Sequence, residues 1–148
     1  MMFILSVFSR GLMAADLGHC LAQAASIEHR IDREESFKFC FNKNKSSTKR
    51  ELCFQNVEQR KDVIASMTLT EQLKSICFYE TSSFLNIKDC VQDSGKFSSA
   101  SDHDEAVFYC YQMFQDKLTK QQCQKTAKKM IFPAKREYLI QHCSDVGD

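Results

Sequence analysis

The sequence is poor in the residues that break helices. It contains one proline, Pro133, and four glycines among 148 residues. Because proline and glycine are the strongest local breakers, turns must come mainly from clusters of serine, threonine, asparagine and aspartate. Hydrophobic residues make up 43% and charged residues 26%, which is the composition of a globular protein and not of a disordered or fibrous one. We therefore expect one globular domain that is helical nearly throughout.

Long apolar runs and a surplus of one charge are also missing. No apolar run reaches the roughly 18 residues that a transmembrane helix requires, so we expect no transmembrane segment. The formal net charge is only +1, so no overall field attracts the chain to an anionic polymer. We expect no nucleic-acid partner.

The sequence lacks the usual motifs of catalytic and metal sites. It contains neither a Cys-x-x-Cys pair nor a His-x-x-x-His pair, which removes the spacing argument for zinc or for a thioredoxin-type site. The four histidines are scattered, and none lies beside a plausible nucleophile. They are His19, His29, His103 and His142. We expect no enzyme, no cofactor and no metal.

One acidic segment resembles a metal-ligand cluster at first sight. It is Asp102-His103-Asp104-Glu105. Consecutive residues do not converge on one face of a helix, so they are poorly placed to share an ion. We interpret the segment as the solvated first turn of a helix, where negative charge is favourable.

What the chain does have is a regular series of eight cysteines. They are Cys20, Cys40, Cys53, Cys77, Cys90, Cys110, Cys123 and Cys143. Taken alternately, they lie 33, 37 and 33 residues apart in one series and 37, 33 and 33 in the other. A fixed period of this size is typical of an internal repeat. An even number of regularly placed cysteines favours disulfides and therefore a secreted, extracellular protein.

The spacing leaves two pairing schemes open. The first joins three pairs of cysteines 13 residues apart and leaves the first cysteine to pair with the last. We prefer it slightly because the two members of each close pair are about equally far from a predicted turn. It consists of Cys40–Cys53, Cys77–Cys90, Cys110–Cys123 and Cys20–Cys143. The second gives four equivalent staples, the last arranged about Pro133. It consists of Cys20–Cys40, Cys53–Cys77, Cys90–Cys110 and Cys123–Cys143.

Hydrophobic residues recur at three- and four-residue intervals around the cysteines, as expected of amphipathic helices. Around Cys110 this set consists of Ala106, Val107, Cys110, Met113, Phe114 and Leu118. We expect each cysteine to face a core, the helix through Cys53 to run to about Met67, and helices to start at Thr119 and Pro133. The predicted fold is all-α: a disulfide-stapled array or bundle of about seven short antiparallel helices, built from repeats of about 33 residues.

Two features bear on processing. The apolar run 2–8 has the character of a signal peptide, but no basic segment precedes it. We therefore interpret residues 1–15 as a weak or truncated signal peptide and residues 16–148 as the single cysteine-rich domain. Asn44-Lys45-Ser46 is an N-glycosylation sequon in a polar stretch, so Asn44 is a candidate glycosylation site.

One patch is basic. It consists of Lys125, Lys128, Lys129, Lys135 and Arg136. These residues surround the apolar segment Met130-Ile131-Phe132-Pro133, so the patch combines an apolar centre with a cationic rim. Such a patch can bind an anionic surface. Solvated lysines on an ordinary helix are the alternative interpretation.

The helical cystine pattern and the segment Leu73-Lys74-Ser75-Ile76-Cys77-Phe78-Tyr79-Glu80 resemble the secreted insect hemolymph glycoprotein family. Members of that family are cysteine-rich, helical and without assigned chemistry, so the resemblance implies a secreted helical protein. Insect odorant-binding proteins are disfavoured, because their closely spaced Cys-x-x-x-Cys is absent.

Two functions from different classes remain. The first is a secreted binding or carrier protein for a small apolar ligand or another protein, suggested by the aromatic and methionine content. The second is a secreted effector of the venom or salivary type that acts on a membrane or receptor through residues 125–136.

Overall fold

A computed structural model describes residues 16–146. Over this range the chain forms nine α-helices, one 3₁₀ segment and no strand. The elements are α1 (Leu17–Ala25), α2 (Arg30–Asn44), α3 (Arg50–Gln59), α4 (Lys61–Ile64), α5 (Met67–Tyr79), α6 (Ile87–Ser94), α7 (Ala100–Phe114), η1 (Gln115–Lys117), α8 (Lys120–Ala127) and α9 (Pro133–His142). The all-α prediction is confirmed, and about seven helices was too few. The predicted signal segment 1–15 lies outside the described residues.

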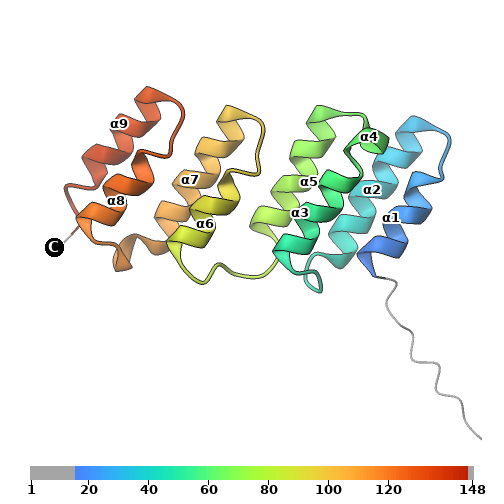
Figure 1. Cartoon of the computed structure of the whole chain (residues 1–148), viewed down its shortest axis with the longest axis horizontal. Coiled ribbons are helices and arrows are strands. Elements are labelled where there is room, and N and C mark those ends of the chain that lie inside the picture. The colour runs from blue at the N-terminus through green and yellow to red at the C-terminus, as the bar shows by residue number, and fades with distance from the viewer. Residues whose placement is uncertain (1–15, 147–148) are drawn as a thin grey trace, which may run out of the picture.

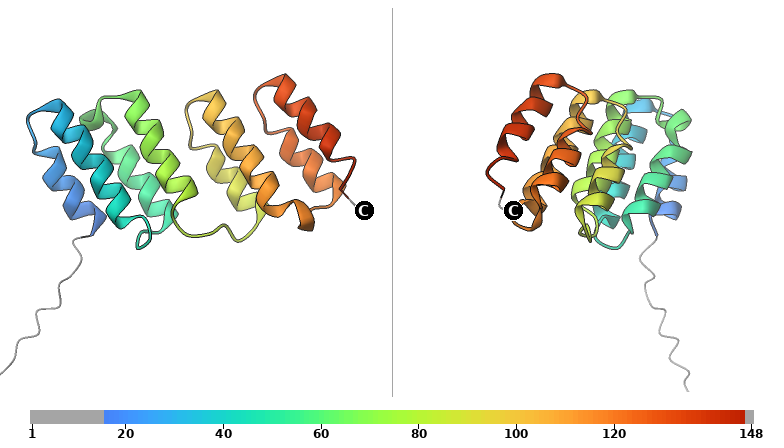
Figure 2. Two further views of the ribbon diagram at one scale, coloured as in Figure 1. Left: turned by 180° about the vertical axis from the view of Figure 1, so that it is seen from behind. Right: turned by 60° about the vertical axis from the view of Figure 1, so that its left-hand side comes forward.

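The helices form four antiparallel hairpins that follow one another along the long axis of the molecule (Figure 1). Hairpin 1 is α1 and α2, hairpin 2 is α3 to α5, hairpin 3 is α6 and α7, and hairpin 4 is α8 and α9. The first helices lie on one side and the second helices on the other (Figure 2), while the turns inside the hairpins share one edge. This arrangement brings residues of neighbouring hairpins together at three junctions.

Each hairpin is closed by one disulfide between its two helices. The bonds are Cys20–Cys40, Cys53–Cys77, Cys90–Cys110 and Cys123–Cys143. The slightly preferred scheme with 13-residue spacing is therefore wrong, and the second scheme is confirmed. The physical reason is geometric: the antiparallel helices of one hairpin bring the paired Cα atoms to 5.5–5.7 Å, within the range a disulfide requires.

The spacing of the paired cysteines is longest in hairpin 2, which contains the additional short helix α4. Disulfide-linked cysteines are 24 residues apart in hairpin 2 and 20 apart in the other three. The difference equals the length of α4, which has four residues. The predicted helix through Cys53 to about Met67 was too long, since α3 ends at Gln59 and α4 ends at Ile64. Ala65 caps α4 in the left-handed conformation, with φ of 50°.

The cysteines face the hydrophobic core, as predicted. Seven of them are buried and Cys20 is partly buried. The core also contains most of the large aromatic side chains near the cysteines. Phe37, Phe41 and Phe78 are almost fully buried, whereas Phe39 is exposed on hairpin 1. The aromatic residues therefore serve mainly to fill the hydrophobic core.

Local signals fix the start of both helices in hairpin 4. Thr119 caps α8 through a reciprocal pair of hydrogen bonds with Gln122, and Pro133 occupies the first turn of α9. Both predicted starts are confirmed. Proline fits there because the first amide groups of a helix have no intrahelical acceptor.

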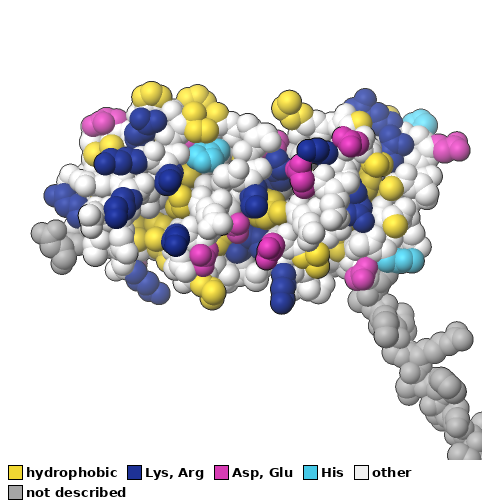
Figure 3. All heavy atoms as spheres, in the orientation of Figure 1, with side chains coloured by type: hydrophobic (Ala, Val, Ile, Leu, Met, Phe, Trp, Pro, Cys, Tyr) yellow, Lys and Arg dark blue, Asp and Glu magenta, His cyan; other side chains and the backbone are white. Residues whose placement is uncertain are grey.

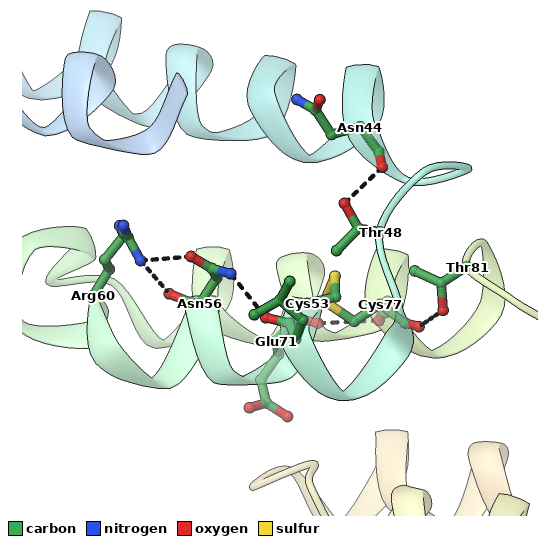
Figure 4. The surroundings of a disulfide bond; sticks show 10 residues. Asn44, Thr48, Cys53, Asn56, Arg60, Glu71, Cys77 and Thr81 are labelled. Atoms are coloured by element: carbon green, nitrogen blue, oxygen red, sulfur yellow. Dashed lines mark hydrogen bonds between the residues drawn. A yellow bond between two sulfur atoms is a disulfide. The ribbon is translucent and has the colours of Figure 1, made fainter. Parts of the chain in front are cut away.

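A buried carboxylate joins hairpin 2 to hairpin 3. Oε2 of Glu71, on α5, accepts hydrogen bonds from the backbone N–H groups of Ser98 and Ser99 at 3.0 and 3.2 Å. Its other oxygen accepts from Lys74 Nζ at 2.9 Å. In Figure 4 the Glu71 carboxylate points away from the disulfide between Cys53 and Cys77. We call such a carboxylate, bound to two amides of the next hairpin's turn, a carboxylate clasp.

A second clasp joins hairpin 3 to hairpin 4. Asp104, on α7, accepts from the backbone N–H groups of Ile131 and Phe132 at 2.7 and 2.9 Å. The predicted solvated turn is wrong at this residue, because the Asp104 side chain is 0% exposed. Its polar atoms find partners in a turn that follows 27 and 28 residues later, which is the same separation as in the first clasp.

Both clasp carboxylates have lowered pKa values. Burial would raise the pKa of Asp104, but hydrogen bonds from Ile131, Phe132 and His103 lower it overall. Burial opposes ionisation of Glu71 as well, and its pKa is lowered by Lys74 and by the two backbone N–H groups. A hydrogen bond donated to the charged form of a carboxylate favours that form. The clasps therefore consist of ionised carboxylates.

Replacing the clasp residue should destabilise the fold. We expect Asp104→Asn to lower the free energy of unfolding by about 2 kcal/mol, because an amide has one acceptor oxygen for the two backbone donors. The matched control is Glu137→Gln, at an exposed position 33 residues later, which should change stability by less than about 0.5 kcal/mol. Denaturant unfolding without reductant measures both, and equal effects would contradict the clasp.

The clasps also predict how stability depends on pH. A carboxylate whose pKa is lowered on folding stabilises the protein above its unfolded pKa, about 3.9 for aspartate, and loses that contribution as the pH falls through the folded value. We therefore expect the stability difference between wild type and Asp104→Asn to be constant near neutral pH and to shrink below about pH 4. A difference that grows on acidification would contradict this assignment.

Candidate functional site

The structure gives the residues of the predicted basic patch different surroundings. The patch lies on hairpin 4, around the turn between α8 and α9. Arg136 is structural, because its guanidinium donates to the carbonyl of Met130 at 2.8 and 3.1 Å and so ties the start of α9 to the turn. Lys135 lies over the ring of Phe132, 5.7 Å from the centroid. Lys128 is exposed beside the turn.

The turn between α8 and α9 presents apolar side chains to solvent. Ile131 is 49% exposed and Phe132 43% exposed, while the preceding Met130 is buried and anchors the turn in the core. We call the exposed residues Lys128, Lys129, Ile131 and Phe132 the α8–α9 tip. In Figure 3 hydrophobic side chains lie next to Lys and Arg side chains over this end of the molecule.

The backbone of the tip is held by hydrogen bonds with two other side chains. The Asp104 clasp binds the backbone N–H groups of Ile131 and Phe132, the residues whose side chains are exposed. Arg136 binds the carbonyl groups of Met130 and Ile131 on the other side of the turn. The polar backbone of the turn is thus satisfied inside the protein, and its side chains are free to meet another surface.

Lys125, the last lysine of the patch, lines a groove, and Lys129 of the tip lines the same groove. Lys125 and Lys129 lie with Ile87, Lys88 and Val91 along a hollow between α6 and α8, which we call the α6–α8 groove. The groove combines residues of hairpins 3 and 4, and sequence reasoning missed its α6 wall. Ile87 and Lys88 follow Asn86, which caps the start of α6, and no local signal shows that α6 lies beside α8.

The groove is one of three along the first-helix side of the array. The others lie between α1 and α3 and between α3 and α6. Adjacent grooves share walls: Gln55 and Gln59 separate the first two, and Gln92 and Gly95 separate the last two. All three are open to solvent, so binding at the junctions would take place at the surface.

The candidate glycosylation site is not on the surface. The Asn44 side chain is 4% exposed, and its Nδ2 donates to the carbonyl of Cys40 at 2.8 Å. Its own carbonyl accepts from Thr48 Oγ1 at 2.8 Å (Figure 4). The atom that would carry a glycan is therefore engaged in the C-terminal turn of α2.

Neither a free thiol nor a metal-binding cluster lies within residues 16–146. All eight cysteines are paired, so they hold the scaffold and present no thiol. Within residues 16–146, no group of three histidine, cysteine or carboxylate residues is arranged to hold a metal ion. In the same range, no helix is long and apolar enough to cross a membrane.

Comparison with known proteins gives no relative: no family model, no curated protein and no solved structure matches the chain. The resemblance to hemolymph glycoproteins therefore stays a prediction, and the function must be argued from the site.

A structural role of Asn44 can be distinguished from its glycosylation by experiment. We expect Asn44→Ala to lower the free energy of unfolding by about 1 kcal/mol, because the hydrogen bond to the Cys40 carbonyl is lost. The control is Ser46→Ala, which removes the sequon without touching that bond and should be neutral. The wild-type protein secreted from a glycosylating host should keep its unmodified mass, and a glycan on folded protein would contradict the buried position.

Proposed function

We propose that this protein is a secreted, disulfide-stapled binding protein without catalytic activity that docks on anionic membrane surfaces through the α8–α9 tip. The observation that carries the proposal is the pair of exposed side chains Ile131 and Phe132, fixed by the Asp104 clasp and flanked by Lys128 and Lys129. Apolar side chains enter the lipid headgroup region, and neighbouring lysines attract anionic lipids at about 1 kcal/mol each.

The disulfides support an extracellular location. Four cystines persist in oxidising compartments, and free thiols would be expected in a reducing one. Since every cysteine is paired, none supplies a thiolate for catalysis. These features favour a durable scaffold whose activity resides in its surface.

The geometry favours docking over carriage of an enclosed apolar ligand. The carrier hypothesis rested on the aromatic content of the sequence, and the largest aromatic side chains fill the core. The three junction grooves are open to solvent. A carrier of a wholly apolar ligand would surround most of it, whereas an open groove leaves part of any bound ligand in water.

We also infer that the four hairpins are copies of one repeat of about 33 residues. The two clasps support this, because their acceptors are 33 residues apart and so are their donors. An acidic residue stands six positions before the second cysteine of every hairpin. These residues are Glu34, Glu71, Asp104 and Glu137. In this interpretation α4 is a four-residue insertion into the second copy.

The docking proposal is tested with vesicles of equal parts phosphatidylcholine and phosphatidylserine. We expect Ile131→Ser/Phe132→Ser to weaken binding by about tenfold or more, because two apolar side chains no longer leave water. Sedimentation with the vesicles measures the change.

The matched control is Ile31→Ser/Met67→Ser, which alters two exposed apolar side chains on hairpins 1 and 2 and should bind as wild type. Binding should weaken with added salt and be lost on pure phosphatidylcholine. Equal loss in both double variants, or binding that ignores lipid charge, would refute docking through the tip.

A further inference from the structure

The α6–α8 groove is a second candidate site on the same end of the molecule, and it is large enough for a small ligand. Its volume is about 640 Å³, which lies within the usual range for small-molecule sites. It is lined by Ile87, Lys88, Val91, Gln92, Gly95, His103, Gln122, Lys125, Thr126 and Lys129. Most of its lining comes from α6 and α8, and His103 of α7 also lines it.

The lining of the groove is mainly apolar. Ile87 and Val91 are separated by one helical turn on α6, and both pack against the core with part of their surface left accessible. The stems of the lysines extend this apolar surface, since lysine keeps only its ammonium group in water. An alkyl chain lying along α6 would replace water against these side chains.

The charged groups of the lining have one sign. Lys88, Lys125 and Lys129 supply three ammonium groups, and no aspartate or glutamate lines the groove. The lining residue His103 contacts the buried carboxylate of Asp104, which already accepts from two backbone N–H groups and from His103. The groove therefore offers cations without an internal counter-charge.

The neighbouring groove provides an internal comparison. Its lining is rich in carboxylates, with two lysines among them. The charged residues are Glu51, Glu58, Asp89, Asp93, Lys74 and Lys96. The groove between α3 and α6 therefore has an excess of negative charge, whereas the charged residues of the α6–α8 groove are lysines. The cationic lining between α6 and α8 belongs to this junction and is not a general property of the array.

We propose that the α6–α8 groove binds one anionic amphiphile, a single alkyl chain with an anionic head group. The chain lies on Ile87 and Val91, and the head group meets Lys125 and Lys129 at the rim. This site goes beyond membrane docking, because it takes a monomeric ligand from solution and does not use Ile131 and Phe132. Of the tip residues it shares only Lys129.

Calorimetric titration of the intact protein with laurate, below its micelle concentration, tests the site. We expect saturable binding of one laurate, with no binding of acetate, which lacks the chain, and at least about tenfold weaker binding of lauryl alcohol, which lacks the charge. Chemical-shift changes in the methyl groups of Ile87 and Val91 should accompany binding. Absence of saturable laurate binding would overturn the proposal.

The decisive variant is Lys88→Gln/Lys125→Gln, which removes two groove cations and leaves the tip intact. We expect it to weaken laurate binding by about tenfold. The matched control is Lys117→Gln/Lys120→Gln, which makes the same charge change outside the groove and should bind as wild type. Equal weakening in both would assign the effect to general attraction and overturn the site.

The tip variant Ile131→Ser/Phe132→Ser separates the two proposals. If it loses vesicle binding and keeps laurate binding, the groove is an independent site. If the groove variant keeps full laurate affinity, the groove proposal fails while docking through the tip stands. Displacement of laurate by polyglutamate, at the affinity of laurate itself, would show a site for acidic polymers and would likewise overturn the proposal.

Discussion

The disulfide inside each hairpin is the constraint on which the rest of the structure depends. Helices of 8 to 15 residues, such as those of hairpins 3 and 4, are marginal in isolation and need tertiary contacts. A cystine between two such helices fixes their facing sides, and the chain-entropy model gives about 3 kcal/mol for a loop of this size. Each hairpin is thereby a stiff unit, so the junctions between hairpins need only a few contacts to align the array.

The clasps show how those junctions are specified. Apolar packing between helices tolerates sliding and rotation, whereas a carboxylate that must meet two amides accepts few positions. Burying a charge is costly unless its partners are in place, so a misaligned junction would leave Glu71 or Asp104 without compensation. The clasp therefore contributes more to the choice of one arrangement than to net stability. At the first junction Glu34 instead accepts a hydrogen bond from Arg30 of its own helix, in the hairpin that precedes α4.

Local signals account for what the sequence predicts well. Thr119 and Pro133 begin helices because caps depend on neighbouring residues, and the cysteines face the core because helical periodicity places them there. The pairing could not be settled, since Cys110 is separated by a turn both from Cys90 and from Cys123. Which partner it meets depends on which helices form a hairpin. Asp104 was misjudged for the same reason: its burial depends on a turn 27 residues later, and a first-turn aspartate is ordinarily solvated.

Asp104 connects the stability of the fold to its proposed activity. A turn that exposes Ile131 and Phe132 loses the burial that would normally hold it in place, so it needs another restraint. The clasp supplies that restraint through backbone amides, which leaves the two side chains free. The equivalent donors at the previous junction, Ser98 and Ser99, belong to a turn with small polar side chains and no apolar pair. The Glu71 clasp thus serves only to align two hairpins, whereas the Asp104 clasp also supports the exposed side chains of the tip. For this reason we seek the function of the protein in hairpin 4.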